Sequence, residues 1–411
     1  MVRQGYAGGA AARYLLLGAV LFLTLFGLVM IFSAGFATDY QKFADSAYHV
    51  KRQAGWVALG MAGMLVLARV DYRGVRRLAW PFLGAADLML LLVLTHGIGK
   101  SGAQRWISVL GVPIQPSEFA KLAVVLAVAA LLSDRRKREA PFAHQVGWLA
   151  LVVLPVVALI MLQPDMGTAM IILVSTFVLL ALGGISARYL FGLAAAAAVA
   201  VPAMIFLEPY RAARFLSFLD PWKDPQRDGY QIIQALYAFG SGGLTGVGLG
   251  LSRQKYFYLP AAHTDFVFAI IGEELGLVGT LAVIAGFVVL AYAGIRIAMG
   301  ARDRFGRMLA GSLTALVVAQ AVMNIAAVTA VMPVTGIPLP LLSYGGSSII
   351  FTLGCIGMVL SVSRYGLQAE RRRAVGLPEE ERVANSAERR RDGRPHLSSI
   401  DGGRAPVRRR A

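Results

Sequence analysis

Apolar residues recur along this chain in ten long runs, which polar or charged stretches separate. Each run is near the roughly 20 residues that an α-helix needs to cross about 30 Å of hydrocarbon. The runs cover approximately residues 12–34, 53–70, 78–95, 117–133, 146–162, 165–183, 188–207, 266–297, 308–332 and 346–363. Pro164 and Asp165 predict a break between the fifth and sixth runs, because proline interrupts the helix and a mid-membrane aspartate is costly. The pattern predicts an all-α integral membrane protein with about ten spans and a large extracytoplasmic loop, 208–264, between spans seven and eight.

Composition excludes a single soluble domain. Of the 411 residues, 57% are hydrophobic and only 15% are charged, which is more apolar surface than one soluble core can bury. Cys355 is the single cysteine and lies in an apolar run, so a disulfide framework and a thiolate metal cluster are both excluded. No small-residue cleavage site follows the first run, which indicates a retained span.

Loop charge predicts the orientation. The connections 69–77, 135–138 and 302–307 are strongly basic and alternate with connections that are not, which places them in the cytoplasm together with both termini. A cytoplasmic segment, 1–11, precedes the first span. From Arg364 onward the chain has 13 arginines and 7 acidic residues without apolar periodicity, which predicts a disordered basic tail over 366–411. The net charge of +17 favours anionic lipid or a cytosolic partner over nucleic acid, because no interleaved aromatic pattern is present.

Polar residues near the extracytoplasmic ends of the spans are the candidates for chemistry. Glu118 and Lys121 lie three residues apart at the start of a helix and can pair on one face. Either they form a structural ion pair, or Lys121 and Arg105 help to hold a diphosphate while Trp106 offers a flat face to a sugar or to the membrane interface. Asp165 follows in the sequence QPDMGT. The glycine-rich GGLTGVGLGLS, 242–252, has backbone amides that can cradle phosphate, and it is equally readable as a connector.

The segment HTDF contains His263, Thr264 and Asp265 and precedes a long apolar helix with Glu273 and Glu274. Thr264 is a natural N-cap residue, and an aspartate in a first helical turn is favoured by the helix dipole, so ordinary capping explains Asp265 on composition alone. His263 is a candidate base or ligand, although a histidine at an interface is more often a hydrogen-bonded structural group. Because the two glutamates are adjacent, they cannot both face one cavity, and at least one should pair with a neighbouring helix.

The stretch from Asn324 to Ser348 contains Ser343 and is interrupted by Pro333, Pro338 and Pro340. Proline forbids a regular helix there, and non-helical backbone near membrane depth persists only when it is buried in protein or lines a wet cavity. This stretch is therefore a further candidate for the wall of a site.

Taken together, 246–279, QPD, PSEFAKL, HTDF and 324–348 closely resemble the SEDS family of membrane glycosyltransferases that polymerise peptidoglycan, over roughly residues 14–365. The sequences of these segments are more similar to the FtsW division branch than to the RodA elongation branch. The resemblance implies a SEDS membrane domain over 12–365 in the bacterial cytoplasmic membrane, acting at the septum. It also implies lipid II as substrate, a class B penicillin-binding protein and other divisome proteins as partners, and Asp265 as the catalytic residue.

The implied reaction is attack by a sugar 4-hydroxyl on an anomeric carbon, with inversion and release of undecaprenyl diphosphate. Asp265 would be the general base, and Arg105, Lys121 or a divalent cation (Mg²⁺ or Mn²⁺) would stabilise the leaving diphosphate. No tightly bound cofactor is expected. The residues expected to bind substrate are Arg105, Trp106, Glu118, Lys121, Asp165, His263 and Ser343. A lipid II flippase, a RodA-like elongation polymerase and a scaffold for a transpeptidase are the alternatives.

Overall fold

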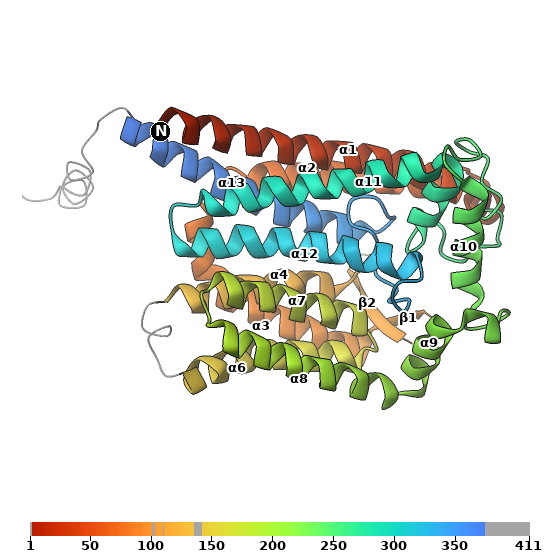
Figure 1. Ribbon diagram of the computed structural model, residues 1–411, viewed down its shortest axis with the longest axis horizontal. Coiled ribbons are helices and arrows are strands. Elements are labelled where there is room, and N and C mark those ends of the chain that lie inside the picture. The colour runs from red at the N-terminus through yellow and green to blue at the C-terminus, as the bar shows by residue number, and fades with distance from the viewer. Residues whose placement is uncertain (1, 101–102, 110, 135–141, 375–411) are drawn as a thin grey trace, which may run out of the picture. The chain divides into compact units, whose positions relative to one another are not determined.

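The computed structural model describes residues 2–100, 103–109, 111–134 and 142–374 (Figure 1). Within these residues ten long helices follow the ten predicted apolar runs. They are α1 (Val2–Phe43), α2 (Tyr48–Leu67), α3 (Tyr72–His96), α4 (Pro116–Ser133), α6 (Phe142–Leu162), α7 (Met166–Leu182), α8 (Ala187–Phe206), α11 (Val267–Met299), α12 (Arg304–Val328) and α13 (Gly346–Ala374). The predicted break is present, because α6 ends at Leu162 and α7 begins at Met166.

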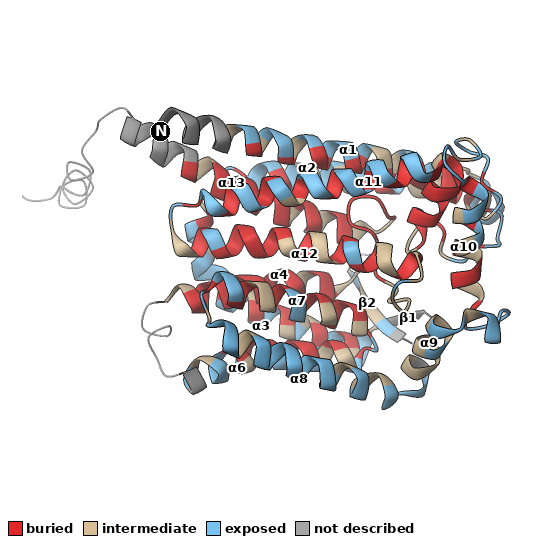
Figure 2. Ribbon diagram, viewed as in Figure 1, coloured by how far each residue is buried: buried red, intermediate tan, exposed pale blue. Residues whose placement is uncertain are grey.

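Most of these helices have the length and composition of membrane spans. In the described part of the chain, eight are long and apolar enough to cross a bilayer; α7 is apolar but shorter, and α2 begins with polar residues. Apolar side chains also cover outer faces. Figure 2 shows α8 exposed along its length, and none of its residues is buried. Exposed apolar helix surface is what hydrocarbon solvates, so the prediction of an all-α membrane protein is confirmed.

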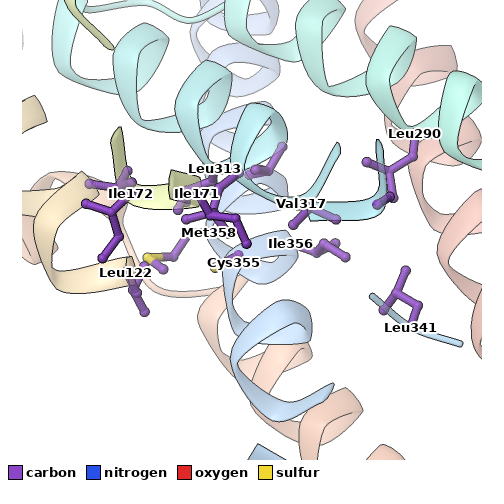
Figure 3. Close-up of a cluster of buried hydrophobic side chains, with 14 of the residues drawn as sticks. Leu122, Ile171, Ile172, Leu290, Leu313, Val317, Leu341, Cys355, Ile356 and Met358 are labelled. Carbon is purple, nitrogen blue, oxygen red and sulfur yellow. The ribbon is translucent and has the colours of Figure 1, made fainter. Parts of the chain in front are cut away.

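The protein core is centred on α4 and α12. All residues of α4 from Pro116 to Leu132 except Phe119 are buried, which its small and aliphatic side chains allow. Leu122 of α4 lies in one cluster with Ile171 of α7, Leu313 of α12 and Cys355 of α13 (Figure 3). The polar residues of α4 are therefore surrounded by protein rather than by lipid.

Two connections contain structure that the hydrophobic pattern does not predict. Between α3 and α4 lie β1 (Ile98–Lys100), β2 (Ala103–Val109) and β3 (Val112–Ile114), paired antiparallel in that order. The expected loop over 208–264 contains the helices α9 (Pro209–Leu219) and α10 (Tyr230–Gly242) and a short 3-10 turn, Pro221–Lys223. These short elements lack the long apolar runs that identify a span.

The helix α11, expected to be continuous, is interrupted at Gly276, where φ is 62° and ψ is −157°. The glycine-rich segment docks on this interruption: the amides of Val247 and Gly248 donate to the carbonyls of Glu273 and Glu274 over 3.0 Å. A Cβ built on Gly276 would lie 2.5 Å from the amide nitrogen of Gly246, so only glycine fits there. The backbone groups that leave the helix ladder are therefore satisfied by protein, as membrane depth requires.

The predicted terminal segments are only partly described. The helix α1 begins at Val2, so the residues expected to form a short N-terminal segment continue the first helix. At the other end α13 continues to Ala374, and the rest of the predicted tail, 375–411, lies outside the described residues.

Candidate functional site

Asp265 lies in a tight turn immediately before α11. Ala261 has φ 57°, and its carbonyl accepts from the amides of Thr264 and Phe266 and from the Thr264 hydroxyl at 3.2 Å. The helix begins only at Val267, with Phe266 as N-cap and no side-chain cap. The expectation that Thr264 caps this helix is therefore wrong, because its hydroxyl closes the preceding turn.

A buried amide fixes the backbone of Asp265. The side-chain nitrogen of Asn324, near the end of α12, donates to the Asp265 carbonyl at 2.8 Å and to the Ile337 carbonyl at 2.7 Å. One side chain thus joins the turn to the proline-containing segment 333–340. A Cβ built on Gly336, which has φ 70°, would lie 3.8 Å from Oδ2 of Asp265. The expectation that this segment lines a candidate site agrees with that geometry.

The charged surroundings of Asp265 come from three other elements. Burial raises the pKa of Asp265 to about 6, the positive charges of Arg214 and Arg105 oppose that rise, and the charge of Asp165 adds to it. The residue is nonetheless partly exposed, and within the described chain its carboxylate makes no side-chain hydrogen bond or ion pair. A carboxylate in this state is available to accept a proton from a ligand near neutral pH.

Arg105 and Trp106 lie on β2. Arg105 donates to the carbonyl of Gln163 at 3.3 Å and to that of Pro164, so it holds the turn between α6 and α7. Trp106 is paired in register with Ile98. The register shifts between Ile98 and Gly99, so Arg105 lies at a β-bulge beside Trp106, and a ligand shared by the two side chains stays a prediction.

Asp165 is the N-cap of α7. Its carboxylate accepts from the Thr168 amide at 3.2 Å and from the Thr168 hydroxyl at 2.9 Å, with Gln115 and Ser117 each 3.5 Å away. Its oxygens are thus occupied by the protein. A role in substrate binding stays a prediction, whereas the negative charge of Asp165 contributes to the raised pKa of Asp265.

Glu118 and Lys121 form the expected pair on α4, with 2.9 Å between Lys121 Nζ and Glu118 Oε1. Both side chains are nearly inaccessible, at 4% and 3%, and the ammonium also donates to Gln320 Oε1 at 2.6 Å. Gln320 in turn donates to the Pro338 carbonyl at 3.0 Å. The pair is therefore a link between α4, α12 and the segment that reaches Asp265, and this geometry favours the structural interpretation over diphosphate binding.

His263 belongs to a polar and aromatic cluster where α1 ends and α2 begins. Its ring centroid lies 4.5 Å from that of His49 and 5.9 Å from that of Tyr344, whose amide donates to the His263 carbonyl at 3.0 Å. Buried Asp39 accepts from the His49 amide at 2.9 Å and contacts its Nδ1. These contacts anchor the turn before Asp265 and support the structural interpretation of His263.

Ser343 closes a turn. Its hydroxyl accepts from the Leu339 amide at 2.8 Å, and its carbonyl accepts from Gln53 of α2 at 3.3 Å. The side chain is 5% exposed, so the expected contact with substrate stays a prediction.

Glu273 and Glu274 both bind the loop that precedes them. Glu274 pairs with Lys255 at 3.0 Å and accepts from Ser33 of α1 at 2.7 Å, which confirms the expected pairing with a neighbouring helix. Glu273 accepts from the Arg253 amide at 2.9 Å and from the Ser252 hydroxyl. Together with the amides of the glycine-rich segment, which bind α11, these contacts identify that segment as docked structure rather than a phosphate cradle.

The described residues contain no group of three or more His, Cys, Asp or Glu side chains that could hold a metal ion. A site built from such protein ligands alone therefore does not fit the described part of the chain, and the metal requirement stays untested.

Two residues at the site were not singled out in the sequence. Arg214 lies on α9 and donates to the Val334 carbonyl at 3.2 Å, and Asn324 was recognised only as the start of a stretch. A polar residue within an apolar helix was the available signal for Asn324. No comparable signal identifies Arg214, because 51 residues separate it from Asp265 along the chain.

Comparison with known proteins shows the class of protein. The family model of the FtsW, RodA and SpoVE proteins, described as "Cell cycle protein", matches residues 13–368. The probable peptidoglycan glycosyltransferase FtsW of Geobacter metallireducens is 41% identical over 83% of this chain and 92% of its own length. Stage V sporulation protein E of Bacillus subtilis is 40% identical over 85% of this chain and 96% of its own.

Solved structures agree. A chain of a peptidoglycan synthase complex that coordinates polymerization and crosslinking superposes with a TM-score of 0.71 at 31% identity, covering 86% of this chain and 98% of that one. The rod shape determining protein RodA of Thermus thermophilus gives a TM-score of 0.63 at 30% identity, covering 85% and 95%. The chain is an integral membrane protein that belongs to the FtsW/RodA/SpoVE family, and it has the SEDS fold.

Proposed function

We propose that this chain is a peptidoglycan glycosyltransferase that polymerises lipid II, with Asp265 as the general base. The observation that carries the proposal is the state of this carboxylate. It is partly exposed, it has no hydrogen-bonding partner within the described chain, and burial raises its pKa to about 6. The names of relatives that match over most of this chain support the same chemistry.

In the proposed reaction, Asp265 accepts the proton of the 4-hydroxyl of an acceptor N-acetylglucosamine. The hydroxyl oxygen forms a bond to the anomeric carbon of N-acetylmuramic acid on the growing strand, and the bond from that carbon to the diphosphate oxygen breaks. The electron pair leaves with undecaprenyl diphosphate. A sugar hydroxyl is a poor nucleophile, so a positioned base contributes roughly 10² to 10⁴ in rate.

The departing diphosphate needs positive charge. Arg105 and Arg214 are the cationic groups whose charges act on Asp265, and both also hold carbonyls of the surrounding turns. Guanidinium groups bind phosphate oxygens with charge-assisted bonds. Lys121 is buried and ion-paired with Glu118, so in this proposal the role falls on the arginines. No step is assigned to a metal ion.

The biological setting is part of the proposal. The basic connections support the proposal that the Asp265 end of the bundle lies outside the cytoplasm and both termini lie inside. A transpeptidase of class B is the proposed partner, supported by the similarity to a synthase complex that couples polymerization to crosslinking. Action at the division septum is proposed from the FtsW names, although a sporulation protein is nearly as similar, at 40% against 41% identity.

The test is glycan synthesis from lipid II by the purified chain with its cognate transpeptidase. Asp265→Asn keeps the shape of the side chain and removes its basicity, so we expect loss of glycan strands with normal folding. Asp228→Asn is the matched control, because Asp228 is exposed in the same outer loop. Strand synthesis by Asp265→Asn at a rate near that of the control would refute the proposed base. Lipid II transfer across vesicles without any strand synthesis by the wild type would favour the flippase.

A further inference from the structure

An arginine-lined hollow lies at the end of the bundle opposite to Asp265. Asp265 precedes α11 and Asp303 follows it, and a helix of 33 residues extends about 50 Å. The hollow has a volume of about 450 Å³ and is lined by Arg73, Arg76, Arg77, Asp303 and Phe305. None of these residues takes part in the chemistry proposed above.

The charges in this hollow are unevenly balanced. Its acidic residue, Asp303, is already engaged: it accepts from the Tyr72 hydroxyl, caps α12 through the Gly306 amide, and lies 4.0 Å from Arg73 Nε. Arg76 and Arg77 are exposed and have no ion pair among the described residues. Two guanidinium groups therefore face a concave surface without a counter-charge, which suits a phosphate group, because the guanidinium fork matches phosphate oxygens.

The helix that presents these arginines continues as an apolar stripe. Arg77, Trp80, Gly84, Leu88 and Leu91 follow one another at spacings of three and four residues, so they share one face of α3, and all are exposed. The face changes from guanidinium through an indole to leucine, which is the order of headgroup, interface and hydrocarbon. From Arg77 to Leu91 it extends about 21 Å, enough to cover the roughly 15 Å of one hydrocarbon leaflet. A Cβ built on Gly84 would meet no atom within 4 Å, so nothing in the protein covers the stripe there.

We propose that this site binds an anionic phospholipid of the adjoining leaflet. Its phosphate lies between Arg73, Arg76 and Arg77, and an acyl chain lies along the exposed face of α3. A soluble phosphate compound shares the headgroup chemistry, but it would leave the stripe without a role. Arginines at a helix end are ordinarily interpreted only as a signal for membrane topology. Such a signal requires neither the hollow nor the position of Arg77 on the same face of α3 as the apolar stripe.

The test measures binding of phosphatidylglycerol to the full purified chain in detergent by native mass spectrometry, with phosphatidylcholine as the neutral lipid. Arg76→Gln and Arg77→Gln should each weaken phosphatidylglycerol binding about fivefold, which corresponds to about 1 kcal/mol per basic residue near a lipid surface. Arg188→Gln is the matched control, because it removes one exposed charge near the same end, at the start of α8, outside the hollow. Phosphatidylcholine binding should be equal in all four proteins.

Two further arms identify the source of the phosphate. Leu88→Asn should weaken phosphatidylglycerol binding, and millimolar inorganic phosphate should fail to displace the lipid. Full displacement by inorganic phosphate, with no effect of Leu88→Asn, would overturn the lipid assignment in favour of a soluble ligand. An equal loss in Arg188→Gln and Arg77→Gln would overturn the site, because it would show attraction by general charge.

Discussion

Replacement of Asn324 by leucine tests how the base is held in place. Leucine has the same number and branching of side-chain heavy atoms as asparagine, so the substitution leaves no cavity. It removes two hydrogen bonds, to the Asp265 and Ile337 carbonyls, at a position that is 2% exposed. Each bond contributes about 0.6 to 1.5 kcal/mol, the lower value being typical of membrane proteins. Asn324 Oδ1 has no partner in the described structure, and its removal offsets part of the loss.

We therefore expect Asn324→Leu to lower the free energy of unfolding by about 1 to 3 kcal/mol. The effect on catalysis should be larger, because the substitution frees the backbone that carries Asp265, and a displacement of about 1 Å can cost 10²-fold in rate. The first measurement is the free energy of unfolding in detergent. The second is the rate of lipid II polymerisation, at a temperature where the variant remains folded.

Ser312→Ala provides the control on the same helix. Ser312 is fully buried and its hydroxyl has no partner in the described structure, so its removal should change stability and rate little. If Asn324→Leu polymerises lipid II as fast as Ser312→Ala, Asn324 does not position Asp265, and the reasoning from its two hydrogen bonds is refuted.

Three other outcomes are expected. Because burial raises the pKa of Asp265 to about 6, the stability contributed by its neutral form is present below about pH 4 and is lost as pH rises through 6. Polymerisation should rise over that upper range, and a flat pH–rate profile between pH 5 and 7 would contradict the assignment. Glu118→Gln and Lys121→Met should each destabilise the protein by about 3 to 5 kcal/mol, whereas the double variant should recover stability and activity if the pair is structural; recovery of stability without activity would instead support a contact with diphosphate. With Cys355 replaced, a cysteine placed at Asp228 should react with an impermeant thiol reagent in intact cells, and a cysteine placed at Arg188 should not. If only the cysteine at Arg188 reacts from outside, the topology is the reverse of the one proposed.

The long apolar runs were sufficient to predict the helices, because a bilayer imposes a length and composition on each span. The strands β1–β3 were missed, since short strands stabilised by pairing carry no comparable signal. The interruption at Gly276 was missed for a related reason. It depends on a segment about 30 residues earlier that supplies the replacement hydrogen bonds.

The candidate site was predicted in part. Pairing of Glu118 with Lys121 follows from helical spacing and is present. The position of Arg214 depends instead on how α9 packs, which no local pattern encodes. The capping expectation for Thr264 failed because its hydroxyl donates to the Ala261 carbonyl within a local turn, and the helix begins only after Phe266.

The interruption at Gly276 divides α11 into an outer part, before Gly276, and an inner part, after it. The outer one follows Asp265 and is bonded to the loop that contains Lys255, whereas the inner one packs through Gly286 against α1 and through Gly294 against α12. We therefore expect a protein that pulls on the loop containing Lys255 to displace the turn that carries Asp265, the proposed base, before it displaces the rest of the helix bundle. We expect spin-label distances from the outer loop to the inner part of α11 to change when a partner binds, and distances within that inner part to stay constant. Equal changes in both would mean that α11 moves as one rod.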